Sequence, residues 1–198
     1  MSRTRRQTLA GLATVIALAG ATAGCQSPTL IVLEDPRTYV EDRSLRDARE
    51  DARIRLDIQA LFAERESGEL RNVAVEVYER TVLLVGTVTT PAARDESGAL
   101  AAGVEGVGRI LNEVQVVGDA GVQATAEDLT VETRIKKALR ADDEIHSANL
   151  RWSSVNGIVY LFGRALSEAE RDRAVAIVRD IDGVREVVDH TKVVPLGD

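Results

Sequence analysis

Val82-Leu83-Leu84-Val85-Gly86 lies over Val159-Tyr160-Leu161-Phe162-Gly163 when the sequence is compared with itself at an offset of 77 positions. The same register aligns further pairs without a gap: Ile58 with Ile135, Arg94-Asp95 with Arg171-Asp172, Gly106-Val107 with Gly183-Val184, and Val116-Val117 with Val193-Val194. Self-similarity that keeps one register over such a length is the signature of a repeated structural unit. The chain is therefore predicted to be a duplicated domain.

Each copy shows the pattern helix, strand, strand, helix, strand. In the second copy, apolar residues at helical spacing predict a first helix over residues 128–140, and residues 149–155 and 158–163 alternate like strands. Asn156-Gly157 joins these strands and is the typical pair of a tight type I′ turn, in which both central residues have positive φ. The first copy has Glu79-Arg80 there, so we expect its turn to be looser or differently shaped.

The second helix of each copy has its own start signals. Ser167 and Glu170 form a capping box that Gly183 is expected to close, and Thr90 with Pro91 opens the same helix in the first copy. The first copy is expected to be the less stable one. Its helix is predicted to contain Gly98 and Gly103, each of which costs about 1 kcal/mol relative to alanine.

A last strand over residues 185–194 matches residues 109–117 and completes the unit. The predicted fold class is α+β, with two tandem two-layer αββαβ domains, each a three-stranded sheet with two helices on one face. The predicted organisation is a signal peptide over 1–24, a tether over 25–44, the first domain over 45–118, a linker over 119–127 and the second domain over 128–198.

The first 24 residues read as an export signal. Three arginines near the start are followed by an uncharged, mostly apolar run over residues 9–21 and by the small residues Ala23 and Gly24. The run is too short to span a bilayer comfortably. The general secretory route fits better than the twin-arginine route, although Arg5-Arg6 leaves the second open.

The stretch from Thr22 to Cys25 resembles the lipobox of bacterial lipoproteins. The resemblance implies that Cys25, the single cysteine of the chain, becomes the acylated N-terminus. Several acyl chains on one residue give stable anchoring. Gln26 favours the outer membrane, because an aspartate there commonly signals inner-membrane retention. The alternative is a soluble secreted protein with a free thiol.

Composition limits the partners of the chain. The formal net charge is −7, and removal of residues 1–24 leaves 22 basic against 32 acidic residues, so nucleic acid is not an expected partner. Aromatic residues make up 3% of the chain, so the core must consist mainly of Val, Ile, Leu and Ala. With one cysteine, no intramolecular disulfide can form.

The leader, the lipobox and two αββαβ units, each with a Val-x-Leu-x-Gly strand and a Gly-Val pair before the last strand, resemble the dual BON-domain outer-membrane lipoproteins of Gram-negative bacteria. The stretch Asp35-Pro36-Arg37-Thr38 is similar to the tether of these proteins. The resemblance implies a non-enzymatic protein, lipid-anchored on the periplasmic face of the outer membrane, that binds anionic phospholipid and supports membrane integrity. It also implies that the first helix of the second domain contacts the lipid.

The helix over residues 128–140 contains the densest basic cluster of the mature chain: Arg134, Lys136, Lys137 and Arg140. Each cation near an anionic surface contributes on the order of 1 kcal/mol. The resemblance adds Thr130, which replaces a tryptophan of the family, and Val131 to the predicted lipid-binding residues. The alternative is a solvated helix face whose cations favour the C-terminal half through the helix dipole.

A second candidate surface is apolar. Leu83, Val85, Ile158, Tyr160 and Phe162 alternate away from the strand residues that face the helices, and an exposed apolar patch of this kind usually meets a partner. Either the two copies pack on each other there, or the chain is an adaptor for an envelope protein or a cell-wall component. The sequence defines neither the lipid, nor the protein partner, nor the oligomeric state.

Enzyme activity is not expected. His146 and His190 have no cysteine ligand at a zinc spacing and are predicted to be ordinary surface histidines. Trp152 is predicted to be a core residue rather than a ligand platform. Arg94-Asp95 and Arg171-Asp172 are repeated, which favours a structural role, and no catalytic triad, phosphate-binding loop, metal site or cofactor site is recognisable.

Overall fold

The computed structural model describes residues 41, 43–118 and 126–195. The predicted signal peptide, Cys25 and nearly all of the tether and linker lie outside these residues. Among the helices of the described ranges, none has the length and apolar character needed to cross a membrane.

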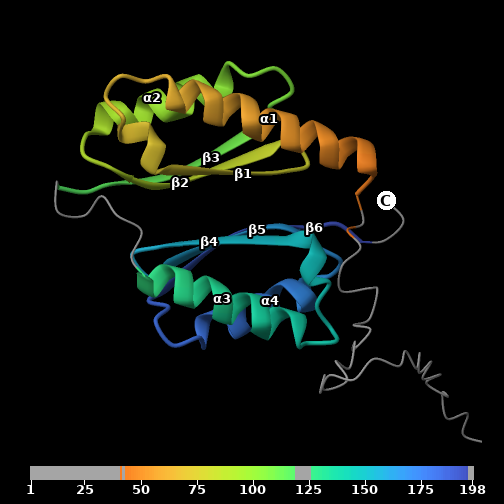
Figure 1. The fold of residues 1–198 in the computed structure, drawn as a ribbon. Helices are drawn as coiled ribbons and strands as arrows, with labels where there is room; N and C mark the ends of the chain where they lie inside the picture. The colour runs from red at the N-terminus through yellow and green to blue at the C-terminus, as the bar shows by residue number, and fades with distance from the viewer. Residues whose placement is uncertain (1–40, 42, 119–125, 196–198) are drawn as a thin grey trace, which may run out of the picture. The chain divides into compact units, whose positions relative to one another are not determined.

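The first domain is a two-layer α+β unit. Its elements, in chain order, are α1 (Leu45–Ala63), the short 3-10 helix η2 (Glu69–Asn72), β1 (Val73–Tyr78), β2 (Thr81–Val88), α2 (Pro91–Ala102) and β3 (Arg109–Val116). The sheet has the order β1-β2-β3, with β1 antiparallel and β3 parallel to β2. The helices α1 and α2 cover one face of this sheet (Figure 1).

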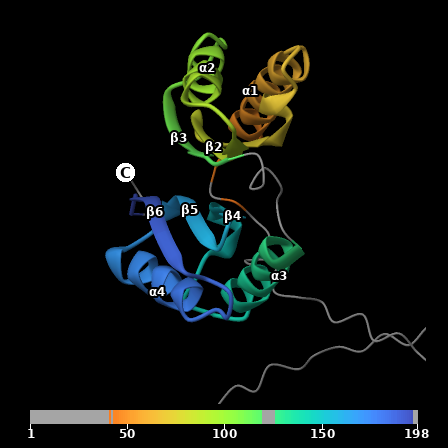
Figure 2. The same ribbon diagram turned by 90° about the vertical axis from the view of Figure 1, so that its left-hand side faces the viewer.

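The second domain repeats this architecture. Its elements are α3 (Ala126–Arg140), η4 (Ser147–Asn149), β4 (Leu150–Val155), β5 (Ile158–Ala165), α4 (Glu168–Arg179) and β6 (Glu186–Val193). The sheet order β4-β5-β6 has the same strand directions, and α3 and α4 lie on one face of it (Figure 2). The register repeats as well, since Val73 pairs with Gly86 and Leu150 with Gly163. The predicted fold class is therefore confirmed.

Helix starts follow the capping residues of the sequence. The side chains of Thr90 and Ser167 accept hydrogen bonds from the backbone N–H of the residue three positions later, at 3.2 and 3.1 Å. The helix ends differ from the prediction. Helix α2 ends at Ala102, so Gly103 caps the helix instead of lying inside it, and Gly183 lies in the turn beyond α4 with φ of 99°.

The turn of the first domain is as tight as that of the second, so the expected looser turn is wrong. Glu79 and Arg80 have φ of 48° and 60°, close to the 53° and 72° of Asn156 and Gly157. The cause lies outside the turn. The Asp51 carboxylate of α1 accepts hydrogen bonds from the backbone N–H groups of Glu79 and Arg80, at 2.7 and 2.8 Å.

The same device holds the second turn. Asp128 occupies the repeat position of Asp51, and its carboxylate accepts from the backbone N–H groups of Asn156 and Gly157, each at 3.0 Å. Both aspartates are almost completely buried, with 2% and 3% of their surface exposed. A buried carboxylate that receives two backbone donors fixes the turn geometry, because charge-assisted hydrogen bonds are the stronger ones.

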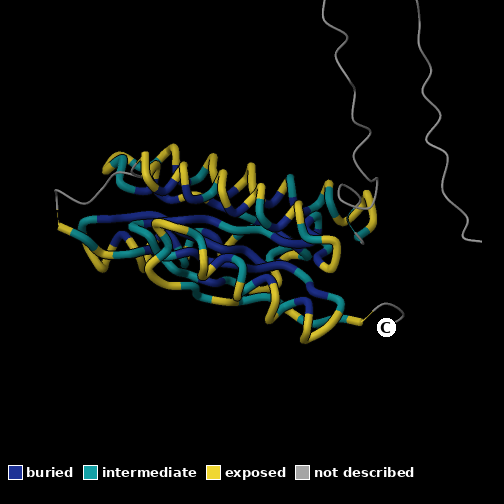
Figure 3. Tube along the Cα trace, turned by 90° about the horizontal axis from the view of Figure 1, so that it is seen from below, coloured by how far each residue is buried: buried dark blue, intermediate teal, exposed yellow. Residues whose placement is uncertain are grey.

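Each domain has a core between its helices and its sheet. The first core is built around Ile54, Ile58, Leu70 and Leu84, and the second around Ile135, Leu139, Leu150, Leu161 and Val178. Strands β2 and β5 are buried along nearly their whole length, whereas the helices are exposed on their outer sides (Figure 3). The cores consist mainly of aliphatic residues, as the low aromatic content requires.

The apolar sheet faces form a third buried cluster, which joins residues of both domains. Its members are Tyr78, Leu83, Val85 and Leu111 of the first domain, and Val155, Tyr160 and Phe162 of the second. The expectation that the copies pack on each other is thereby confirmed. The adaptor alternative loses its surface, because these side chains are buried inside the described part of the chain.

Polar contacts accompany this cluster. Nε2 of His190 lies 2.8 Å from Oε1 of Glu113, and Gln115 donates to the Tyr160 hydroxyl at 3.1 Å. The His190 side chain is 20% exposed, so it is an inter-domain residue and not the predicted surface histidine. The His146 side chain is 45% exposed, and its Nδ1 lies 3.2 Å from Oε1 of Glu170.

Candidate functional site

One face of α3 belongs to the second core. Val131, Ile135 and Leu139 are buried there, and Val131 is only 2% exposed. A Cβ atom at Gly183 would lie 2.8 Å from Cγ2 of Val131, which shows how closely the following loop packs on this side chain. Val131 thus belongs to the core between α3 and its sheet, and its predicted contact with lipid stays a prediction.

The outer face of α3 has a mixed character. Leu129 is 63% exposed, and Lys136, Lys137 and Arg140 are exposed further along the helix. Thr130 is exposed as well, but its hydroxyl donates to the Ala126 carbonyl oxygen at 2.9 Å. The helix thus presents one large apolar side chain near its N-terminal end and cations near its C-terminal end.

The four predicted cations are not equivalent. Arg134 is tied to the loop after α4, since its guanidinium donates to the Asp182 carbonyl oxygen at 2.7 Å and lies 3.2 Å from the Asp182 carboxylate. Lys136 and Lys137 form no ion pair with any described residue. These two ammonium groups are therefore available to an external anion.

Three acidic residues near this face have partners elsewhere. Glu132 accepts a hydrogen bond from the Ser154 backbone N–H at 2.9 Å, which turns its carboxylate towards β4. Asp142, after the end of α3, lies 2.8 Å from the Arg173 guanidinium, and the hydrogen bond from Arg173 holds its pKa below the usual value. Glu144 lies 3.2 Å from the same arginine. Part of the local negative charge is therefore compensated on the α4 side.

The basic cluster is absent from the first domain. At the offset of 77 positions, Arg134, Lys136, Lys137 and Arg140 correspond to the following α1 residues: Asp57, Gln59, Ala60 and Ala63. The cores, turns and sheets of the two domains repeat, whereas this charge pattern does not. The shared fold therefore does not require the charge pattern of α3.

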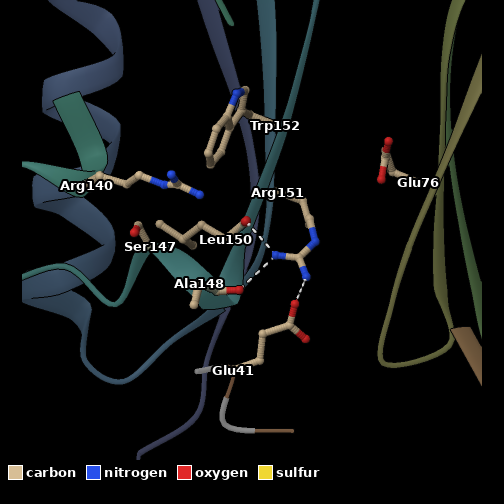
Figure 4. A pocket seen from close by; sticks show the side chains of 8 residues that line it. All are labelled: Glu41, Glu76, Arg140, Ser147, Ala148, Leu150, Arg151 and Trp152. Carbon is tan, nitrogen blue, oxygen red and sulfur yellow. Dashed lines mark hydrogen bonds and ion pairs between the residues drawn. The ribbon is translucent and has the colours of Figure 1, made fainter. Parts of the chain in front are cut away.

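A pocket of about 310 Å³ opens beside this helix, where α3, η4 and the edge strand β4 meet (Figure 4). Trp152 forms part of its wall and is half-buried against the second core, so the predicted core role is correct only for part of its surface. Arg151 donates to the carbonyl oxygens of Ala148 and Leu150, at 2.8 and 2.9 Å, and pairs with Glu41.

Glu41 also connects this pocket to the first domain. Its carboxylate pairs with Arg43, which in turn pairs with Asp51. The guanidinium groups of Arg43 and Arg151 lie 4.7 and 5.2 Å from the centre of the Tyr78 ring. Sequence reasoning missed this cluster because its members occupy non-equivalent repeat positions and are far apart in the chain.

Within residues 41, 43–118 and 126–195, no group of His, Cys, Asp and Glu side chains is arranged to hold a metal ion. The two sheets, the buried turn aspartates and the exposed basic helix define a class of protein: a tandem of two-layer αββαβ domains whose candidate site is a helix surface.

The chain belongs to the BON domain family, whose model matches residues 50–118 and 127–195. The predicted family is therefore confirmed, and both of its copies are matched.

Several curated proteins are similar to the chain in sequence, at moderate identity. It is 35% identical over 120 residues to a 21 kDa hemolysin of Actinobacillus pleuropneumoniae. This alignment covers 61% of each protein, so the chain spans about three fifths of the length of the hemolysin. It is 29% identical to osmotically-inducible protein Y of Escherichia coli (72% of each chain) and 29% identical to outer membrane lipoprotein DolP of Haemophilus influenzae (79% of this chain, 78% of the relative). None of these names is that of an enzyme.

Among solved structures, CdsD, a structural protein of the type III secretion system of Chlamydia trachomatis, is similar with a TM-score of 0.31 and 18% identity. The similarity covers 74% of this chain and 65% of CdsD.

Proposed function

We propose that the chain is an outer-membrane lipoprotein, anchored through Cys25 and facing the periplasm, whose helix α3 binds anionic phospholipid and so supports membrane integrity. The observation that carries the proposal is the outer face of α3, where Lys136 and Lys137 lack an ion-pair partner among the described residues and Leu129 is exposed. An exposed apolar side chain beside cations suits the boundary between headgroups and acyl chains.

The electrostatic free energy that Lys136 and Lys137 can contribute is sufficient for weak membrane binding, and an acyl anchor would raise the bound fraction. Two ammonium groups near an anionic surface contribute roughly 2 kcal/mol, which is about a thirtyfold gain in affinity. An acyl anchor on Cys25 would hold α3 at a high effective concentration beside the bilayer. A locally basic helix can therefore act although the whole chain is acidic, with a formal net charge of −7.

The similarity to an outer membrane lipoprotein supports the proposed anchor and location. Mass spectrometry of the chain isolated from an expressing Gram-negative cell tests the anchor directly. We expect a mature N-terminal peptide that starts at an acylated Cys25, and a Cys25→Ser variant that leaves the membrane fraction. An unmodified thiol on a freely soluble chain would contradict anchoring while leaving the binding face of α3 open to its own test.

The binding face is tested by co-sedimentation with vesicles that contain phosphatidylglycerol. We expect a Lys136→Glu/Lys137→Glu variant to lose most of its binding, and the binding of the unaltered chain to weaken as salt is raised. Arg46→Glu/Arg49→Glu in α1 is the matched control, because it changes the net charge equally on exposed positions of the first domain. Equal loss in both variants would reduce the effect to overall charge and refute the assignment to α3.

A further inference from the structure

The pocket beside α3 has a chemical character that the basic helix face alone does not have. Its lining residues include Glu41, Glu76, Arg140, Ser147, Arg151 and Trp152 (Figure 4). It thus combines carboxylates, guanidinium groups and one indole ring around a volume of about 310 Å³. A pocket with both charge signs and an aromatic wall fits a small ligand that itself carries both signs.

The space exists because of a difference between the two domains. Ser147 occupies the repeat position of Leu70, and Leu70 is fully buried in the first core. The serine leaves out most of that side-chain volume, and its hydroxyl has no hydrogen-bond partner although it is buried. Buried hydroxyl groups normally have partners. The second domain therefore has a hollow where the first domain has a leucine.

Glu76 supplies a carboxylate on the first-domain side of the pocket. It forms no hydrogen bond or ion pair with any described residue. Burial raises the pKa of Glu76, although Arg55 and Arg151 act to lower it. The protein thus desolvates this carboxylate without pairing it, and a cationic group from outside would provide the missing partner.

The remaining walls supply a place for an anion. Arg140 ends α3 and extends along the pocket from the proposed lipid-binding face. The Arg151 guanidinium is held by two backbone carbonyl oxygens and Glu41 between the Trp152 wall and the first domain. Guanidinium groups bind phosphate oxygens well.

We propose that this pocket binds an ammonium–phosphate zwitterion of the phosphoethanolamine type, with the ammonium group at Glu76 and the phosphate at Arg140. The proposal rests on the proposed function in that it places a headgroup site next to the lipid-binding helix. Phosphatidylethanolamine in a membrane and a soluble phosphoethanolamine ester present this same chemistry, and the two arms of the experiment distinguish them.

Trp152 provides a direct readout because it is the single tryptophan of the chain. In the first arm, soluble glycerophosphoethanolamine is titrated into the full chain and Trp152 emission is recorded. We expect a saturable change with glycerophosphoethanolamine and none with glycerol 3-phosphate, which lacks the ammonium group. No saturable change, or an equal response to both compounds, would overturn the proposal.

In the second arm, vesicles of phosphatidylglycerol and phosphatidylcholine are compared with vesicles in which phosphatidylethanolamine replaces the phosphatidylcholine. If the natural ligand is the lipid headgroup, we expect an emission change only with the vesicles that contain phosphatidylethanolamine. A response to the soluble ester alone supports the pocket and assigns it to a soluble ligand. Because the Lys136→Glu/Lys137→Glu variant affects sedimentation but not the soluble titration, failure of the pocket and failure of the helix face give different results.

Two variants test the residues. Glu76→Gln keeps the shape of the side chain and removes a charge that burial already disfavours, so the variant is expected to fold. Its affinity for glycerophosphoethanolamine is expected to fall by about tenfold or more. Ser147→Leu restores the residue of the first domain, and is expected to abolish the emission change while the unfolding midpoint stays or rises. If Glu76→Gln responds like the unaltered chain, the carboxylate has no role and the proposal fails, whatever the second variant does.

Discussion

Replacing Asp51 by alanine tests how the first domain builds its tight turn from two residues that disfavour it. Asp51 holds the backbone N–H groups of Glu79 and Arg80, which have positive φ. Positive φ costs roughly 1 kcal/mol or more for each ordinary residue, so the carboxylate must offset this strain. The variant Asp51→Ala removes both hydrogen bonds and the ion pair with Arg43.

The expected loss follows from these contacts. A hydrogen bond to a charged group contributes about 1.5–3 kcal/mol, and water can reach the exposed Arg80 backbone in the variant, which reduces its share. We therefore expect the free energy of unfolding to fall by about 2–4 kcal/mol. Glu79→Asn/Arg80→Gly in the Asp51→Ala background should recover about 1 kcal/mol, because that pair adopts the turn readily. The recovery is partial, since Arg80 also donates to the Gly106 carbonyl oxygen.

Urea unfolding followed by far-UV circular dichroism measures the loss, while Trp152 fluorescence follows the second domain separately. Asp57→Ala is the matched control in α1, because it removes only an exposed ion pair with Arg53 and should change stability by less than about 0.5 kcal/mol. A loss below about 1 kcal/mol for Asp51→Ala, or no recovery with Asn-Gly, would refute the role assigned to the carboxylate.

Three further outcomes are expected. Gly163→Ala should destabilise the second domain by more than about 3 kcal/mol in urea unfolding, because its Cβ would lie 2.2 Å from the Asn149 carbonyl oxygen at a φ of 117°. Burial raises the pKa of Tyr78 to about 12. The protonated phenol therefore contributes fully to the free energy of unfolding below pH 10, and roughly 2 kcal/mol of this free energy is lost between pH 10 and 12. Tyr78→Phe should flatten that part of the curve of stability against pH. Val131→Ala should cost about 2 kcal/mol of stability and leave vesicle binding of the folded chain unchanged, and a selective loss of binding would return Val131 to the lipid-contacting surface.

The repeat allowed much of the fold to be predicted. The ungapped offset, the Asn156-Gly157 turn and the capping residues Thr90 and Ser167 specify elements through local rules, and the structure contains these elements. Alternation along β2 and β5 also showed which side chains face away from the helices. The pattern predicted that this apolar face is covered, and the packing of the two domains on each other was one of the two possibilities that it left open.

Other features depend on contacts that local patterns do not encode. The Glu79-Arg80 turn is set by Asp51, which lies 28 residues earlier in the chain. Helical spacing groups Val131 with Ile135 and Leu139, which are buried, and only the family resemblance added it to the predicted lipid-binding residues. Similarly, Arg134 was predicted from the sequence to be one of the lipid-binding cations. It pairs with Asp182, a loop residue 48 positions later in the chain.

The pair of His190 and Glu113 has a consequence for how such a chain originates. The two residues are 77 positions apart and so occupy the same place in their domains, and the same holds for Leu83 and Tyr160, and for Val85 and Phe162, in the shared apolar cluster. Corresponding surfaces therefore meet, as they do across the two-fold axis of a homodimer. The tandem chain therefore has the interface of a fused dimer, in which each half covers the apolar sheet face of the other.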